Sequence, residues 1–252
     1  MSFNIRYDNK GDEENWWEYR KEELVEMVRH YHPDFLGVQE GLIHQLRFID
    51  DMFTKYSYIG VGRDDGKEKG EFAAIFYDST QFELVESNTF WLSETSKTVS
   101  VGWDASMERI CTYGSFINRR TKKKIFVFNA HFDHIGRESR RKSAQLIIDK
   151  ISELNIFQEN IIVMGDFNCE PMDDPILLFT KSLEDGLISS VMEDHGPEGT
   201  YNGFDLGSRT ENRIDYIFTR NIEVSKYIHV NDRRENNLFI SDHLPVYIEF
   251  KN

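Results

Sequence analysis

The apolar and polar residues of the chain follow two different spacings. Residues 2–7 alternate apolar and polar side chains, which predicts a half-buried strand. In residues 19–31 the apolar side chains fall on one helical stripe, and Pro33 ends that predicted helix. The same two patterns predict strands at 34–40, 56–62, 71–78, 82–92, 108–117 and 124–130, and a helix at 42–53.

The second half of the chain continues this mixture. Apolar spacing predicts a helix over 144–154, which leads into the strand-like run "NIIVMGDFN" of residues 160–168. Asp174 and Pro175 predict the N-cap and first position of a short helix. Late strands are expected at 212–220 and 244–250. Because no linker or repeat divides these elements, residues 1–252 are expected to form a single α/β domain with mixed sheets.

The amino-acid composition limits the classes of function that the chain can have. The 252 residues are 39% hydrophobic, which supports a real core and excludes a disordered chain. The formal net charge of −14 disfavours binding of nucleic acid over a broad surface. It slightly favours a small substrate, or a site that binds cations. Two cysteines, Cys111 and Cys169, suggest reduced thiols and no disulfide framework.

Targeting signals are missing from the printed sequence. No apolar stretch approaches the length of a membrane span, and the chain shows no signal-peptide pattern. We therefore expect no membrane insertion and a cytoplasmic location, or secretion if a leader has been removed. A monomer is expected.

Polar side chains cluster where the predicted strands end. Asp166 and Asn168 are two residues apart, so they point to the same side of an extended backbone, and the same holds for Asn129, His131 and Asp133. If the strands lie side by side, these clusters meet in one site. The five clusters are Asn4, Glu40, "NAHFDH" (129–134), "GDFN" (165–168) and "SDHLP" (241–245).

These residue types suit one kind of chemistry. Carboxylates, amides and waters are ligands for Mg²⁺ or Mn²⁺, and the chain has no paired thiolates for structural zinc. Zinc held by His131 and His134 is disfavoured, because strand residues three apart point to opposite sides. Histidine–aspartate pairs transfer protons and stabilise anions. The set predicts metal-assisted attack of water on a phosphate ester.

Each cluster alone also has a simpler structural explanation. Asp166 and Asn168 could form a turn after a strand, and Glu40 could be an acid at a helix start. Asn4 could be an amide on the polar face of a strand. The order of the clusters along the chain favours the functional interpretation.

The ordered motifs resemble those of the endonuclease/exonuclease/phosphatase superfamily, which includes deoxyribonuclease I. The resemblance rests on "SFNIR", "VQE", "NAHFDH", "GDFN" and "SDHLP", which extend from residue 4 to residue 246. It implies a four-layer sandwich in which two mixed β-sheets pack face to face, with helices on the outer faces and the site at one rim.

The resemblance also implies the roles of the metal-binding and water-activating residues. Glu40 would bind the Mg²⁺ or Mn²⁺, with Asn4 and Asp242 close to that ion or to a second one. Asp166 would orient or deprotonate the attacking water, helped by Asn168.

Further residues would act on the phosphate. His243 would contact the scissile phosphate, and Asp215 would pair with that histidine and fix its tautomer. His131, partnered by Glu71, would also act at the phosphate, which Arg109 would reach. Tyr201 and Asn202 are expected near the rim of the site.

The expected function is a phosphodiesterase or phosphatase that uses a divalent metal ion. A small phosphate ester is slightly favoured over nucleic acid as the substrate. A nuclease with the same site stays an alternative, as does a binding protein that keeps the fold without turnover. The Trp-Cys-Asp-Arg run of inositol polyphosphate 5-phosphatases is replaced here by "NRIDYIF", which disfavours that subgroup.

Overall fold

The computed structural model describes residues 1–191 and 196–250, and its strands form two six-stranded sheets. The first sheet has the order β11-β12-β1-β2-β4-β3 and the second the order β5-β6-β7-β8-β10-β9. The strands are β1 (Ser2–Asn4), β2 (Phe35–Gly41), β3 (Tyr56–Ile59), β4 (Phe72–Asp78), β5 (Phe82–Trp91), β6 (Ile110–Asn118), β7 (Lys124–His131), β8 (Asn160–Asp166), β9 (Glu184–Asp185), β10 (Asp215–Arg220), β11 (Val224–His229) and β12 (Val246–Phe250).

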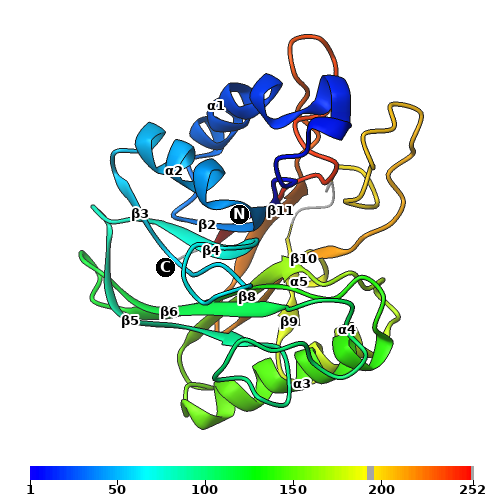
Figure 1. Ribbon diagram of the computed structural model, residues 1–252. Coiled ribbons are helices and arrows are strands. Elements are labelled where there is room, and N and C mark those ends of the chain that lie inside the picture. The colour runs from blue at the N-terminus through cyan, green and yellow to red at the C-terminus, as the bar shows by residue number, and fades with distance from the viewer. Residues whose placement is uncertain (192–195, 251–252) are drawn as a thin grey trace.

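The helices lie outside the two sheets (Figure 1). One apolar cluster joins α1 and α2 to the first sheet, a second joins α3 and α4 to the second sheet, and a third lies between the sheets. This is the predicted four-layer sandwich, and both sheets are mixed because β1–β2 and β7–β8 are parallel pairs. The helices are η1 (Lys10–Asn15), η2 (Trp17–Tyr19), α1 (Lys21–Tyr31), α2 (Ile43–Met52), α3 (Arg137–Glu153), α4 (Asp174–Phe179) and α5 (Gly186–Ser189).

The apolar run of β8 is explained by burial on both faces. Ile161 and Val163 belong to the cluster under α3 and α4, whereas Ile162 and Met164 belong to the cluster between the sheets. A strand covered on both faces needs an unbroken apolar run instead of alternation. The run ends where β8 reaches the rim of the sandwich, at Asp166.

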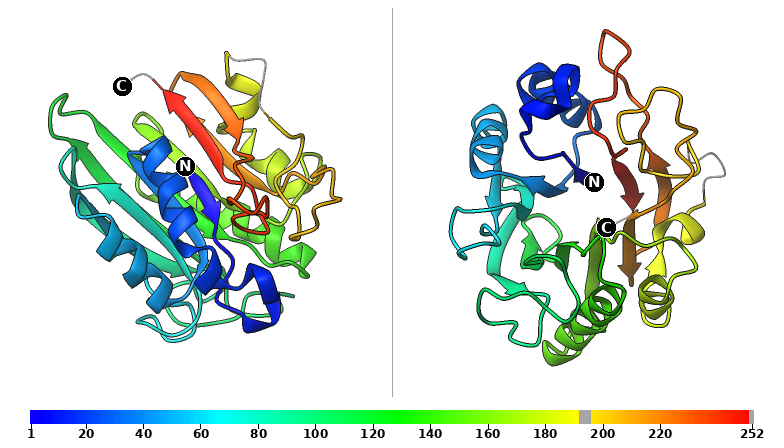
Figure 2. Two further views of the ribbon diagram at one scale, coloured as in Figure 1. Left: turned by 90° about the horizontal axis from the view of Figure 1, so that it is seen from above. Right: turned by 45° about the vertical axis from the view of Figure 1, so that its right-hand side comes forward.

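The two ends of the chain meet in the first sheet. Strand β1 pairs with β12 and with β2, so the blue and red strands lie side by side in Figure 2. The predicted strand over 2–7 is too long, because β1 ends at Asn4 and Arg6 has a left-handed backbone with φ 58°. This turn holds residues 5–7 at the rim of the sandwich.

Two helix starts also differ from the sequence prediction. Helix α3 begins at Arg137 and not near residue 144, because the Asp104 carboxylate accepts hydrogen bonds from the backbone of Glu138 and Ser139. That cap comes from a distant loop, which local spacing does not reveal. In α4 the N-cap is Asp173 and not Asp174.

Asn129 of β7 connects the two sheets through the core. Its Nδ2 donates to the carbonyl oxygens of Val38 at 2.9 Å and Ala74 at 2.8 Å, and its Oδ1 accepts from Gln39 Nε2 at 2.6 Å. A buried amide with these partners is satisfied and fixed in place. Asn129 therefore aligns the sheets and does not reach the pocket, contrary to its expected place in the polar cluster.

Other expectations concern the cysteines and the membrane. Cys111 and Cys169 are both buried free thiols, as predicted. Within residues 1–191 and 196–250, no helix combines the length and apolar character needed to cross a bilayer.

We expect the stability of the fold to fall in acid because of His229. Its Nδ1 faces the Pro197 carbonyl at 2.6 Å and its Nε2 faces the Tyr227 hydroxyl at 3.2 Å. Burial lowers the pKa of His229 from 6.5 to about 4, despite the opposing effect of the Pro197 carbonyl. Between these values the unfolded chain binds more protons than the folded one, so stability is lost as pH falls through this window.

The size of this effect can be measured by unfolding in urea at several pH values. His229 should contribute a loss of about 3 kcal/mol between pH 7 and pH 4. The variant His229→Gln should be less stable at pH 7 but should lack this part of the acid sensitivity. An unchanged pH dependence in the variant would show that other groups cause it.

Candidate active site

A pocket of about 500 Å³ lies at the rim of the sandwich. The first sheet contributes Glu40 from β2, and the second contributes His131 from β7 and Asp166 from β8. Asn4 and Asp215 lie behind the pocket and contact its lining. All ten predicted site residues thus come together, and the eight that line the pocket are Glu40, Glu71, Arg109, His131, Asp166, Asn168, Asp242 and His243.

Strand register places the residues from the second sheet. Asp166 pairs with His131 across the parallel β7–β8 ladder and with Asp215 across the antiparallel β8–β10 ladder. Gly165 permits this close approach, because it has φ 151° and a Cβ there would lie 2.0 Å from the Ala130 carbonyl oxygen. The glycine of "GDFN" is therefore required by the backbone.

Asp166 is buried and held by two donors. Its Oδ2 accepts from Asn4 Nδ2 at 3.0 Å and its Oδ1 accepts from the backbone N–H of Asn168 at 2.9 Å. Burial and the neighbouring Asp215 raise the pKa of Asp166 to about 7, although His243 and the two donors oppose the shift. A carboxyl group with this pKa can exchange a proton near neutral pH.

Glu40 reaches the pocket because of a bulge in β2. The register of β2 against β4 shifts between Val38 and Gly41, and Glu40 has φ 62°. A bulge of this kind re-aims a side chain at the end of a strand. The carboxylate then accepts from Asn4 Nδ2 at 3.1 Å and from the backbone N–H of Tyr7 at 3.2 Å.

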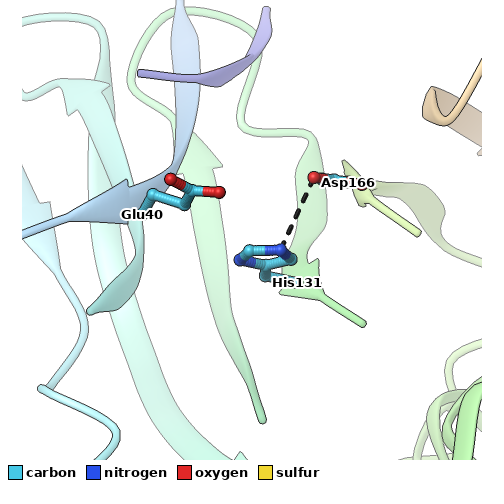
Figure 3. Close-up of side chains that lie close together, drawn as sticks. All are labelled: Glu40, His131 and Asp166. Carbon is cyan, nitrogen blue, oxygen red and sulfur yellow. Dashed lines mark ion pairs between the residues drawn. The ribbon is translucent and has the colours of Figure 1, made fainter. Parts of the chain in front are cut away.

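His131 lies close to Asp166, and Glu40 comes from the facing sheet (Figure 3). Its Nε2 lies 3.5 Å from Asp166 Oδ2, and its Nδ1 lies 3.8 Å from Glu71 Oε2. Burial lowers the pKa of His131 well below its usual value, and the charges of Arg109 and Arg63 lower it further, so the ring is neutral. Burial also raises the pKa of Glu71 to about 7, despite its contact with Arg63.

His243 is protonated, in contrast to the neutral ring of His131. Its Nδ1 lies 2.8 Å from Asp215 Oδ2, and its Nε2 lies 3.8 Å from Asp166 Oδ2. Burial alone would lower the pKa of His243, but Asp215 and Asp166 outweigh it and raise that pKa well above its usual value. His131 and His243 therefore present one neutral imidazole and one imidazolium to the pocket.

The donor set fits a divalent cation. Glu40, His131 and Asp166 each offer one ligand atom, and these atoms all lie within 4.8 Å of one another. The pKa of Asp242 is raised by burial, and Glu40 adds to the shift, so negative charge is crowded in this part of the pocket. Carboxylate oxygens are the ligands that Mg²⁺ and Mn²⁺ prefer.

Comparison with known proteins identifies the family of this chain. A model of the endonuclease/exonuclease/phosphatase family matches residues 1–243. The chain belongs to this family.

Similar members of the family include bacterial proteins of the same length. A mannosyl-6-phosphatase of Bacteroides thetaiotaomicron is 38% identical, with a TM-score of 0.94 and coverage of 100% of this chain and 98% of that chain. An endonuclease/exonuclease/phosphatase from Bacteroides vulgatus is 36% identical, with a TM-score of 0.94 and coverage of 99% and 97%. A protein of Saccharomyces cerevisiae named as a probable RNA exonuclease is 27% identical over 179 residues, which are 66% of this chain and 34% of that protein.

The side-chain amides of Asn4 and Asn168 form hydrogen bonds to other residues of the site. Asn4 donates through Nδ2 to both Glu40 and Asp166, while its Oδ1 accepts from the backbone N–H of Arg6. It therefore holds the two carboxylates in place, and its role as a metal ligand stays a prediction. Asn168 donates to the Phe132 carbonyl at 3.1 Å and lies 3.4 Å from His131 Nε2.

Arg109 is fixed by the segment after β7. Its NH2 donates to His134 Nδ1 at 3.0 Å and its Nε lies 3.4 Å from Asp133 Oδ2. The remaining nitrogen, NH1, is buried and has no hydrogen-bond partner among the described residues. His134 lines the pocket, and Asp133 holds Arg109 from behind.

Two arginines that line the pocket were not predicted from the sequence. Arg63 forms two hydrogen bonds to Glu71, at 2.7 and 2.8 Å, from the loop between β3 and β4. Arg6 also lines the pocket. Of the two expected rim residues, Tyr201 does line the pocket, whereas buried Asn202 donates to the Ser241 carbonyl.

Proposed function

We propose that this family member is a phosphatase that uses Mg²⁺ or Mn²⁺ to hydrolyse a small phosphomonoester, with a sugar phosphate as the substrate class. The observation that carries the proposal is the meeting of Glu40, Asp166, His131 and the His243–Asp215 pair in one pocket. Phosphoester hydrolysis needs a cation site, a base for water and a donor to the phosphoryl group. Side chains in and behind this pocket would meet these three needs.

Glu40 would hold the cation, with the His131 ring and the Asp166 carboxylate close to it. A bound divalent cation supplies Lewis-acid stabilisation of the charge that develops on the phosphoryl oxygens. Asn4 keeps both carboxylates in position through its two hydrogen bonds. The role of Asn4 is thus to orient the acids.

Asp166 and His243 would handle the protons. Asp166 accepts a proton from the attacking water, because its raised pKa matches neutral pH. His243 stays protonated beside Asp215 and donates a hydrogen bond to a phosphoryl oxygen. Arg109 contributes a guanidinium to the same side of the pocket as His131.

Two features support a small substrate. The mannosyl-6-phosphatase of Bacteroides thetaiotaomicron is similar over the full length of this chain. The net charge of −14 weakens binding to nucleic acid, whereas a pocket of about 500 Å³ is in the size range of small-molecule sites.

A substrate panel tests the proposal. Hexose 6-phosphates, nucleotides, bis-p-nitrophenyl phosphate, oligoribonucleotides and plasmid DNA would be compared at one concentration of Mg²⁺ or Mn²⁺, with kcat/KM as the measure. The sugar phosphates should rank first. Faster cleavage of RNA would favour the nuclease alternative, and no turnover of any ester by folded protein would favour a binding protein.

The variant Glu40→Gln should bind the metal less tightly. One charged ligand becomes a neutral amide, so the Mn²⁺ concentration that gives half-maximal activity should rise about 10-fold or more. The Mn²⁺ dependence of sugar phosphate hydrolysis measures this. Glu68→Gln, which changes an exposed glutamate paired with Arg47, is the matched control and should leave the dependence unchanged.

A further inference from the structure

Arg20 is a fully buried arginine, 0% exposed, directly before α1. Its guanidinium donates four hydrogen bonds, and among the described residues all of the acceptors are backbone carbonyls. They belong to Asn15 at 2.8 Å, Ile5 at 2.5 Å, Arg6 at 2.9 Å and Ile240 at 3.3 Å. Burial lowers the pKa of Arg20 to about 10, although the charge of Asp242 opposes the shift, so the group stays charged at neutral pH.

Two of the segments that Arg20 holds carry residues of the site. Ile5 directly follows Asn4, which orients the two acids, and Ile240 comes three residues before His243. The two segments also meet directly, because Ser241 Oγ donates to the Asn4 carbonyl at 2.7 Å. The guanidinium therefore joins the first and the last parts of the site from behind.

The loop of residues 201–204 belongs to the same arrangement. The Phe204 ring lies 5.8 Å from the guanidinium carbon of Arg20, and the rings of Tyr201 and His243 contact each other with centroids 5.1 Å apart. On its other side the guanidinium lies 5.3 Å from the Trp17 ring. Aromatic rings around an arginine restrict how its planar group can turn.

Only a guanidinium can make this set of contacts. It carries five N–H donors in a planar fork, so one side chain reaches carbonyls on several segments at once. A lysine keeps the charge but has all of its donors on a single nitrogen. The position of Ile240 relative to Ile5 therefore depends on the shape of the Arg20 side chain as well as on its charge.

We propose that Arg20 is a positioning residue, which sets the place of His243 relative to Asn4 through the backbone of residues 5–6 and 240. The inference rests on the role that the proposed function gives to His243. A shift of about 1 Å in a catalytic group can lower the rate about 10²-fold. Arg20 acts from behind the site and does not touch the substrate.

The kinetics of Arg20 variants test the inference at saturating Mn²⁺, with the best substrate of the panel. Arg20→Gln keeps one amide in place of the fork and should lower kcat about 10²-fold, while KM stays within a few-fold of wild type. Arg20→Lys should show a similar loss although it keeps the charge. In Arg20→Ala, guanidinium chloride at concentrations too low to unfold the protein should restore most of the lost kcat, and ammonium chloride should not.

Arg220→Ala is the matched control. Arg220, at the end of β10, also donates to backbone carbonyls, those of Phe157 at 2.8 Å and Ser182 at 2.6 Å, and lies over the Phe157 ring. Neither of these partners lines the pocket. This variant should unfold at lower urea concentration but keep the wild-type kcat. A loss of kcat in the Arg20 variants no larger than in Arg220→Ala would mean that Arg20 only stabilises the fold, and would overturn the inference.

Crystal structures of the wild type and Arg20→Gln give a measurement that needs no substrate. In the variant the hydrogen bond from Ser241 to the Asn4 carbonyl should lengthen or break, and His243 should be displaced. Unchanged positions would overturn the inference, as would a wild-type rate in Arg20→Lys. If Arg20→Ala does not fold, the Gln and Lys variants decide the question.

Failure of the proposed function would give a different result. No hydrolysis of any ester by the folded wild-type chain would overturn that function. A displaced His243 in the crystal structure of Arg20→Gln would then still support the positioning role of Arg20.

Discussion

Replacing Asp166 by asparagine is expected to lower kcat by about 10³-fold. The amide cannot take a proton from water, but its oxygen can still accept from Asn4 Nδ2 or from the backbone N–H of Asn168. The change also removes a negative charge that lies beside Asp215 in the buried site. The variant should therefore fold normally and unfold at a temperature equal to or above that of the wild type.

The measurement is steady-state hydrolysis of the best substrate at saturating Mn²⁺. Saturation separates loss of the base from weaker metal binding, which is the effect expected of Glu40→Gln. Asp149→Asn, on the exposed face of α3, is the matched control and should keep the wild-type rate. A kcat within a few-fold of wild type in Asp166→Asn would remove Asp166 from the role of base.

The second large effect is expected at the pair formed by His243 and Asp215. His243→Gln should lower kcat by about 10²-fold or more, because it removes the imidazolium that donates to the phosphoryl group. Asp215→Asn should cause a similar loss, since the ring would no longer be held protonated and oriented at 2.8 Å. The double variant should be no slower than His243→Gln alone.

The activity of the double variant distinguishes two residues that act together from two residues that act independently. Residues that act as one unit show strongly non-additive losses, whereas separate contributions would multiply. Activities of the two single variants and the double variant complete the cycle, and unfolding in urea checks stability. A double variant with the product of both losses would mean that Asp215 acts on something other than His243.

Much of this architecture could be predicted from the sequence. The apolar run before Asp166 indicated a strand, and the structure buries both faces of that strand. The order of the polar clusters along the chain indicated that the strand ends meet. Gly165, the glycine of "GDFN", lies against the Ala130 carbonyl, where a residue with a Cβ would not fit. These features are local, or follow from a motif order that the family shares.

The missed features depend on contacts between distant segments. The bulge that aims Glu40 arises from pairing with β4, which the spacing within residues 34–40 does not show. The partner of Arg63 lies across a loop, and Arg6 reaches Asp242 only because the first and last strands are neighbours. Side-chain alternation along residues 129–133 also predicted that Asn129 and His131 point into the same site. It could not show that β7 reaches the rim of the sandwich only at His131, with Asn129 in the interior.

The proposed catalytic groups come from two separate sheets, so the packing between the sheets sets how these groups are aligned. Glu40 belongs to one sheet and Asp166 to the other, and the Asn129 amide is one of the few polar ties that set how the sheets sit against each other. A relative could keep every residue that lines the pocket and still lose efficiency if Asn129 were replaced by an apolar side chain. Comparing proteins of this architecture by their pocket residues alone would overlook that difference.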